Sequence, residues 1–202
     1  MALIKLAVLA SGRGSNLQAI IDEIKNGRLS AEIKAVISDC PHAQALERAQ
    51  SENIPALFLN PKVHSSRRDY DLALAEKVKE FQVDLVVLAG FMRVLSTGFL
   101  DQFPHKVINI HPALLPSFPG THAQKQALEY GVKISGCTVH FVDQGVDTGP
   151  IIAQRSVPVK YDDTEETLSE RILIEEHKLY PQAIQWIAEG RVKVSGRRVK
   201  IL

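Results

Sequence analysis

The stretch LIKLAVLASGRGSNLQAI, residues 3–20, places a glycine-rich turn between an apolar run and the start of a helical pattern. The run Ile4–Ala10 predicts a buried strand, and Asn16–Gly27 predicts a helix that ends at a glycine. A strand, a glycine-rich turn and a helix in this order are typical of nucleotide-binding folds. The turn therefore raises three possibilities: a dinucleotide site, a site for one phosphate, or a turn without a ligand.

The first half of the chain repeats this alternation of strand and helix. Further strands are predicted at Glu32–Ser38, Pro55–Leu59 and Val83–Gly90, with helices at His42–Asn53 and Ser66–Phe81 between them. Because these strands are apolar on both sides and are separated by helices, they predict a parallel sheet that is covered on two faces.

The second half has a different pattern. The alternation of Ile134–Asp143 predicts a longer strand with one wetter face, which pairs with Pro150–Val159. Helices are predicted at Ala123–Tyr130 and from Thr164 to Glu189, the second opened by Asp163 and Glu166 as in a capping box, and a terminal hairpin turns at Ser195-Gly196. The predicted fold is α/β, a single domain over residues 1–202. Its Rossmann-like, open, mostly parallel sheet has helices on both faces and an antiparallel addition in the C-terminal half.

Composition excludes several classes of function. The net charge is +1, from 24 Lys and Arg against 23 Asp and Glu, so no overall field attracts nucleic acid or an anionic membrane. No charged segment precedes a signal-like core, and no apolar run approaches the roughly 20 residues of a membrane span. Cys40 and Cys137 lie far apart and are interpreted as buried, reduced thiols. We therefore expect a cytoplasmic protein with neither a nucleic-acid nor a membrane partner.

The turn GRG, residues 12–14, matches the start of the dinucleotide pattern G-x-G-x-x-G, but Leu17 occupies the third glycine position. That glycine permits close packing of helix against strand, so Leu17 counts against NAD binding. The backbone N–H groups of Gly14, Ser15 and Asn16 would lie at a helix N-terminus, where the helix dipole favours an anion. The turn fits one phosphate, and a plain strand-to-helix turn capped by Ser15 is the open alternative.

Asn109 and His111 lie two residues apart in VINIHP, residues 107–112, so both point to the same face of a predicted strand. An amide and an imidazole there could stabilise developing negative charge and handle a proton, although a lone Asn/His pair of this kind is more often structural than catalytic. Asp147 lies at the tip of the loop DQGVDTGPII, residues 143–152, and either bonds its own turn or reaches His111. In the second case it would raise the pKa of the imidazole and favour the protonated form.

Three further features are candidates for binding. Glu175 and Glu176 lie on or beside the apolar stripe of the long helix, where each could reach a ligand amine, a ligand hydroxyl or solvent. The segment GFMRVLS, residues 90–96, follows a strand at the position where open parallel sheets bind ligands. Arg67 and Arg68 form either a solvated pair or a carboxylate clamp. The histidines have no compact metal-ligand spacing, so no metal is expected.

Taken together, the sequence resembles the phosphoribosylglycinamide formyltransferases, folate-dependent enzymes of purine biosynthesis. The matching stretches occur in the family's order over nearly the whole chain: LASGRGSNLQAII, DLVVLAGFMRVLS, INIHPALLPSFPG, TVHFVDQGVDTGPII and EEHKLYP. The resemblance implies that a formyl group passes from the co-substrate 10-formyltetrahydrofolate to the amine of phosphoribosylglycinamide, without a metal. It also implies a phosphate-binding half, residues 1–100, and a folate-binding and catalytic half, residues 101–202.

The resemblance assigns roles residue by residue. The implied catalytic residues are Asn109, His111 and Asp147, the phosphate loop falls on Gly14, Ser15 and Asn16, and the carboxylate beside the glycinamide is Glu176. The implied folate pocket consists of Arg67, Met92, Arg93, Val94, Leu95, Asn109, Asp143, Gln144, Gly145, Val146 and Asp147, with Arg67 toward the glutamate tail. In the implied reaction, Asn109 and a protonated His111 stabilise the oxygen of a tetrahedral species. Asp147 holds the histidine and relays a proton.

Alternatives remain from related and unrelated classes. Methionyl-tRNA formyltransferase needs an added C-terminal domain, and formyltetrahydrofolate hydrolase an added N-terminal one, and neither addition is expected here. In a non-catalytic Rossmann-like nucleotide-binding module, Asp39 would bind a ribose, but Leu17 argues against that class. The sequence is compatible with a monomer or a homodimer that acts on small-molecule substrates.

Overall fold

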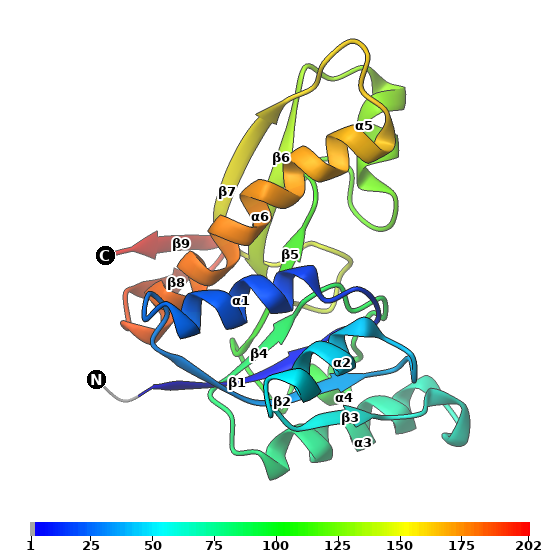
Figure 1. The fold of residues 1–202 in the computed structure, drawn as a ribbon, viewed down its shortest axis with the longest axis vertical. Helices are drawn as coiled ribbons and strands as arrows, with labels where there is room; N and C mark the ends of the chain where they lie inside the picture. The colour runs from blue at the N-terminus through cyan, green and yellow to red at the C-terminus, as the bar shows by residue number, and fades with distance from the viewer. Residues whose placement is uncertain (1–2) are drawn as a thin grey trace. The chain divides into compact units, whose positions relative to one another are not determined.

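The computed structural model describes residues 3–202, which divide into two compact units between Ile108 and Asn109. The first unit alternates strands and helices (Figure 1). Its elements are β1 (Ile4–Leu9), α1 (Ser15–Lys25), β2 (Ala31–Ser38), α2 (Gln44–Ser51), β3 (Ala56–Phe58), the 3-10 helix η1 (Pro61–Val63), α3 (Arg67–Glu80), β4 (Leu85–Leu88) and α4 (Thr97–Leu100). The strand β5 (Val107–His111) begins in this unit and ends in the second.

The second unit is built from two long strands, two helices and a terminal hairpin. Its elements are α5 (Ala123–Tyr130), β6 (Ile134–Phe141), β7 (Ile151–Pro158), α6 (Glu165–Ala188), β8 (Val192–Ser195) and β9 (Arg198–Ile201). The helix α6 packs along β6 and β7 (Figure 1). The hairpin of β8 and β9 is antiparallel and forms a sheet of its own.

The large sheet has seven strands in the order β3-β2-β1-β4-β5-β6-β7. The pairs β1–β2, β2–β3 and β1–β4 are parallel, whereas β6 and β7 pair antiparallel. The predicted fold class, a mostly parallel sheet with an antiparallel addition in the C-terminal half, is therefore confirmed.

The core of the first unit lies along β1 and β4, which are buried on both faces. The chain runs from β1 outward to β2 and β3 and then returns to place β4 on the other side of β1. Because such crossovers are right-handed, α1 and α2 lie on one face of the sheet and α3 on the opposite face (Figure 1). The strand order reverses between β1 and β4, and open α/β sheets bind ligands beyond the carboxyl ends of the strands at such a point.

The expectation about β6 was wrong, and the helix α4 was missed. The strand β6 has no wet face, because every residue from Ser135 to Phe141 is buried. The polar members of the strand find protein partners: Thr138 donates to the carbonyl of Ala113 at 2.6 Å and accepts the N–H of Leu115 at 3.0 Å. The short helix α4 was not predicted, since a single turn gives too few residues for a helical period.

The capping-box expectation for α6 was wrong in its residues. Thr164 is the N-cap and exchanges hydrogen bonds with Thr167, whereas Asp163 binds Arg171 at 2.7 Å. The hydrogen bond from Arg171 lowers the pKa of Asp163 far below its usual range. The expectation for the thiols holds in part: Cys137 is buried, but Cys40 is only half-buried, and neither forms a disulfide.

Within residues 3–202, no helix has the length and apolar character needed to cross a membrane.

Candidate active site

The glycine-rich turn of the first unit ends at Gly14, which is the N-cap of α1 and has a left-handed backbone with φ of 68°. No side chain caps this helix end, and its first turn contains no acidic residue. The alternative in which Ser15 caps the turn is therefore wrong, because Ser15 is already the first helical residue. The N-terminal backbone N–H groups of α1 carry partial positive charge that no capping side chain or first-turn carboxylate offsets.

Contacts with α2 and with the end of β4 fix the shape of this turn. The N–H of Ala45 donates to the carbonyl of Gly12 at 3.1 Å, and the guanidinium of Arg48 donates to the carbonyl of Arg13 at 2.8 Å. On the other side, the hydroxyl of Ser11 accepts the N–H of Met92 at 2.9 Å. The loops that follow β1 and β4 are thus tied directly to each other within the first unit.

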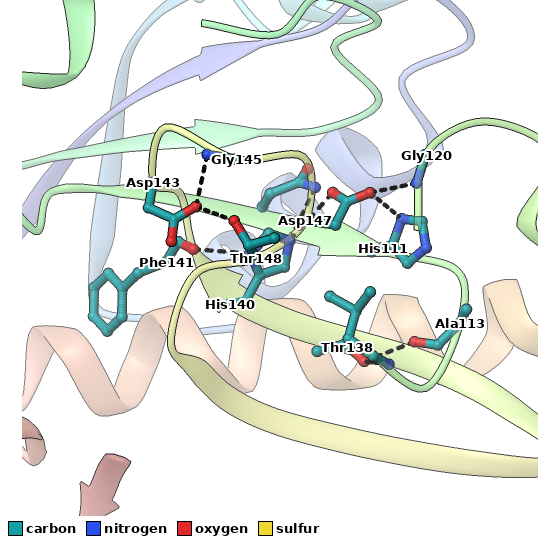
Figure 2. A network of polar contacts seen from close by, with 12 residues as sticks. His111, Ala113, Gly120, Thr138, His140, Phe141, Asp143, Gly145, Asp147 and Thr148 are labelled. Atoms are coloured by element: carbon teal, nitrogen blue, oxygen red, sulfur yellow. Dashed lines mark hydrogen bonds and ion pairs between the residues drawn. The ribbon is translucent and has the colours of Figure 1, made fainter. Parts of the chain in front are cut away.

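In the second unit, the end of β5 presents Asn109 and the buried His111, which is 4% exposed. Asp147 does reach His111: its Oδ2 lies 3.3 Å from His111 Nδ1 and also accepts the N–H of Gly120 at 2.8 Å (Figure 2). The other ring nitrogen, Nε2, lies 2.8 Å from the carbonyl of Phe118 and donates to it. Both nitrogens of the imidazole therefore face acceptors.

The expectation that Asp147 raises the pKa of His111 was incomplete, and the predicted net direction was wrong. Burial lowers the pKa of His111, because the interior disfavours the charged imidazolium. The carboxylate of Asp147 and the carbonyl of Phe118 oppose this effect without reversing it. His111 is therefore less readily protonated in the folded protein than an exposed histidine.

His140 is a member of the site that sequence reasoning assigned no role. Its Nδ1 lies 2.8 Å from the carbonyl of Phe141 and donates to it, which leaves Nε2 as the acceptor of the neutral ring. Nε2 accepts the side-chain amide of Asn109 at 3.3 Å and lies 3.6 Å from Oδ1 of Asp147. His140 thus connects Asn109 with Asp147. The signal available in the sequence was a histidine within an otherwise uncharged strand.

Asp147 lies on a loop whose conformation is set by Asp143. Oδ1 of Asp143 accepts the N–H of Gly145 at 3.1 Å and the hydroxyl of Thr148 at 2.5 Å (Figure 2). Asp143, and not Asp147, bonds its own turn, so Asp147 is free to point at the histidines. Its φ of 54° is a left-handed conformation that Asp tolerates better than most residues and that recurs at functional sites.

Asp147 is ionised at neutral pH. Burial opposes ionisation, but the adjacent ring of His140, the hydrogen bond from the N–H of Gly120 and the nearby His111 hold the pKa of this carboxyl below its usual value. A carboxylate and two histidines in contact form a site that can accept and release a proton.

The long helix α6 contributes a buried carboxylate to the same unit. Glu176 is 6% exposed, whereas Glu175 turns outward and pairs with Lys178 at 2.8 Å. The structure thereby resolves which of the two glutamates points inward. Burial and the nearby charge of Glu176 raise the pKa of the Cys137 thiol to about 12, so Cys137 is an inert packing residue.

The chain is similar to proteins of known families over most of its length. The model of the formyl transferase family matches residues 4–184. The chain belongs to this family. It is 43% identical over 189 residues to the phosphoribosylglycinamide formyltransferase of Escherichia coli, a match that covers 94% of this chain and 89% of that protein. It is 53% identical to a glycinamide ribonucleotide transformylase from Symbiobacterium toebii, with a TM-score of 0.98 over 99% of this chain and 94% of the other.

The chain is also similar to one section of larger proteins. It is 48% identical over 190 residues to the human trifunctional purine biosynthetic protein adenosine-3. The match covers 94% of this chain and 19% of the human protein, so the chain spans about a fifth of that relative's length. Within residues 3–202 of this formyl transferase, no three His, Cys, Asp or Glu side chains come together as metal ligands would.

The residues expected in the folate pocket fall in both units. In the first unit, Met92 is 73% exposed and Val94 is also exposed, but Leu95 is buried. The guanidinium of Arg67 donates to the carbonyl of Val94 and does not extend freely as a clamp, whereas Arg68 is exposed. Exposed candidates of the second unit are Gln144, Gly145 and Val146. Each unit thus presents exposed apolar side chains on a loop: Met92 and Val94 in the first unit and Val146 in the second.

Proposed function

We propose that this chain transfers the formyl group of 10-formyltetrahydrofolate to the amine of 5'-phosphoribosylglycinamide, a step of purine biosynthesis that yields formylglycinamide ribonucleotide and tetrahydrofolate. The observation that carries the proposal is the buried contact of Asp147 with His111 and His140, in a chain whose full-length relatives bear the name of this activity. Both units together form the catalytic domain, residues 1–202. They act on small molecules, as a monomer or a homodimer and without a metal.

In the proposed reaction the amine nitrogen bonds to the formyl carbon, the bond from that carbon to the folate nitrogen breaks, and one proton moves from the amine to the folate nitrogen. The side-chain amide of Asn109 donates to the carbonyl oxygen as it gains negative charge. One such donor contributes roughly 3–4 kcal/mol in related acyl transfers. For His111 to donate to the same oxygen, its Nε2–H must leave the carbonyl of Phe118, which it contacts at 2.8 Å in the resting protein.

Asp147 carries the proton in this scheme. It is the group whose ionisation the structure favours, and its contacts with both histidines fix its position. The resting His111 is neutral near pH 7, because burial lowers its pKa. His140 keeps the amide of Asn109 in the orientation in which it donates.

Substrate binding is divided among the other residues. Gly14, Ser15 and Asn16 bind the phosphate at the start of α1, and Glu176 accepts a hydrogen bond from the glycinamide side. The proposed folate-binding residues are Arg67, Met92, Arg93, Val94, Leu95, Asn109, Asp143, Gln144, Gly145, Val146 and Asp147.

The experiment mixes the purified chain with 10-formyltetrahydrofolate and phosphoribosylglycinamide and follows the change in folate absorbance. We expect turnover that depends on both substrates, and we expect H111A to lose most of it while retaining the far-UV circular dichroism of the wild type. H42A, which changes an exposed histidine outside the site, is the matched control and keeps its activity. Absence of turnover in the wild type would refute the proposal, and folate conversion without the ribonucleotide would identify a hydrolase instead.

A further inference from the structure

The first turn of α3 contacts the segment that follows β4, and one of its residues is a fully buried carboxylate. Asp71 is 0% exposed. Its Oδ2 accepts the backbone N–H of Ser96 at 2.8 Å and lies 3.9 Å from Nε of Arg67. Burying a carboxylate is costly unless hydrogen bonds or opposite charge compensate it, so a leucine or alanine would be the expected residue at a position with only a packing role.

Asp71 is the central member of several contacts from α3 to one short segment, residues 92–96. The guanidinium of Arg67 donates to the carbonyl of Val94, and that of Arg93 lies over the ring of the buried Tyr70, 4.7 Å from its centroid. Successive members of the segment are thus held by neighbouring residues of one helical turn. The segment therefore cannot shift without breaking an interaction with a buried group.

The same cluster contains polar atoms without a hydrogen-bond partner among the residues that the structure describes. They are Oδ1 of Asp39, the hydroxyl of Tyr70, Oδ1 of Asp71, Nε of Arg93 and Oγ of Ser96. Polar groups buried in this state are rare and cost stability. Five such atoms lie beside one loop, and each lowers the stability of the fold. A local cost of this kind is typical of a functional segment.

We propose that Asp71 is a positioning residue: it holds residues 92–96 in the conformation that binds the formyl donor, without touching that substrate itself. This inference rests on the proposed function, in which Met92, Arg93, Val94 and Leu95 contact the donor. Asp71 acts through the backbone of Ser96, which fixes one end of the segment, while Met92 is fixed at the other end by Ser11.

The test compares D71N and D71A with the wild type by steady-state kinetics, varying each substrate in turn. D71A removes an acceptor that carries charge, so we expect the KM for 10-formyltetrahydrofolate to rise about tenfold or more. D71N keeps an oxygen that can accept the N–H of Ser96, and its rise is smaller. We expect kcat and the KM for phosphoribosylglycinamide to remain close to the wild-type values in both variants.

The matched control is D69N, which makes the same charge change on the same turn at an exposed residue. Its carboxylate is exposed and accepts the hydroxyl of Ser66, so the kinetics of D69N should equal those of the wild type. A second readout, hydrogen exchange at the Ser96 amide, should quicken in D71A and less in D71N. If D71A does not fold, D71N carries the test on both readouts.

The outcomes distinguish failure of the positioning role of Asp71 from failure of the proposed function. If the wild type transfers the formyl group but the donor's KM is unchanged in the Asp71 variants, or both KM values rise together, the positioning role is refuted and the proposed function stands. If the wild type transfers no formyl group, the proposed function fails and this inference fails with it.

Discussion

Gly14 allows the sharpest calculation, because two independent terms penalise any side chain at this position. Its φ of 68° lies in the left-handed region, which costs a non-glycine residue about 1–2 kcal/mol. An added Cβ would lie 2.8 Å from both Cα and Cβ of Ala45, so α2 would have to move by several tenths of an ångström. Overpacking of this kind costs about 1–3 kcal/mol. The stiffer unfolded chain of an alanine variant offsets up to about 1 kcal/mol.

The expected destabilisation of G14A is therefore about 1–5 kcal/mol in the free energy of unfolding. In a chain of this size it corresponds to a decrease in Tm of about 2–20 °C. The assay is urea unfolding followed by circular dichroism, together with calorimetry for Tm. Gly14 is the N-cap of α1, so relief of the contact with Ala45 also displaces the start of α1. The KM for phosphoribosylglycinamide should therefore rise as well.

G12A is the matched control for this prediction. Gly12 lies two residues away in the same turn, but its added Cβ would have no atom within 4 Å and its backbone is not left-handed. We expect its free energy of unfolding to stay within about 0.5 kcal/mol of the wild type. Equal stability of G14A and the wild type, or equal losses in the two variants, would refute the reasoning from backbone conformation and steric contact.

Other predictions concern protons and thiols. Burial lowers the pKa of His111 in the folded protein, so the neutral ring contributes to the free energy of unfolding. This contribution is fully present above the unfolded-state pKa near 6.5 and is lost as the pH falls. H111Q should therefore reduce the difference in urea midpoint between about pH 7.5 and about pH 5.5. H140L should lower kcat about tenfold or more with smaller effects on either KM, since it removes the acceptor that orients a catalytic amide; an unchanged kcat would contradict this role. Native protein should react with a thiol reagent at Cys40 before Cys137, because Cys137 is buried and its pKa is raised to about 12; labelling of C40A should then require denaturant.

The sequence was sufficient to predict elements whose signal is local. The strands β1 and β4 can be predicted from their own residues, because strands buried on both faces are continuous apolar runs without polar alternation. The glycine at the start of α1 is likewise a local signal. The fold class follows from their alternation with helices. The position of Asp147 beside His111 does not follow, because it depends on a contact between residues 36 positions apart and on a left-handed turn held by Asp143.

The failures have the same origin. The polar residues of β6 predict a wet face by their spacing, but Thr138 and His140 are buried because the segment after β5 and the side chain of Asn109 supply their hydrogen bonds. A pattern records polarity, and only the tertiary structure decides whether water or protein satisfies it. The role of His140 was missed for this reason: the alternation of the strand predicted that its polar residues face solvent.

The protonation of His111 shows how opposing contributions suit such a site to chemistry. Hydrogen bonding favours the imidazolium, since Nδ1 faces a carboxylate and Nε2 faces a carbonyl, whereas burial favours the neutral ring. Burial prevails in the resting protein, so the pKa is lowered. As negative charge develops on an oxygen nearby, it adds to the first contribution and raises the proton affinity of the ring at the moment when a proton must be held. A fully exposed histidine lacks the burial contribution that keeps it neutral beforehand. A buried one without Asp147 lacks the charge that would hold the proton, and the proposed transfer therefore needs both.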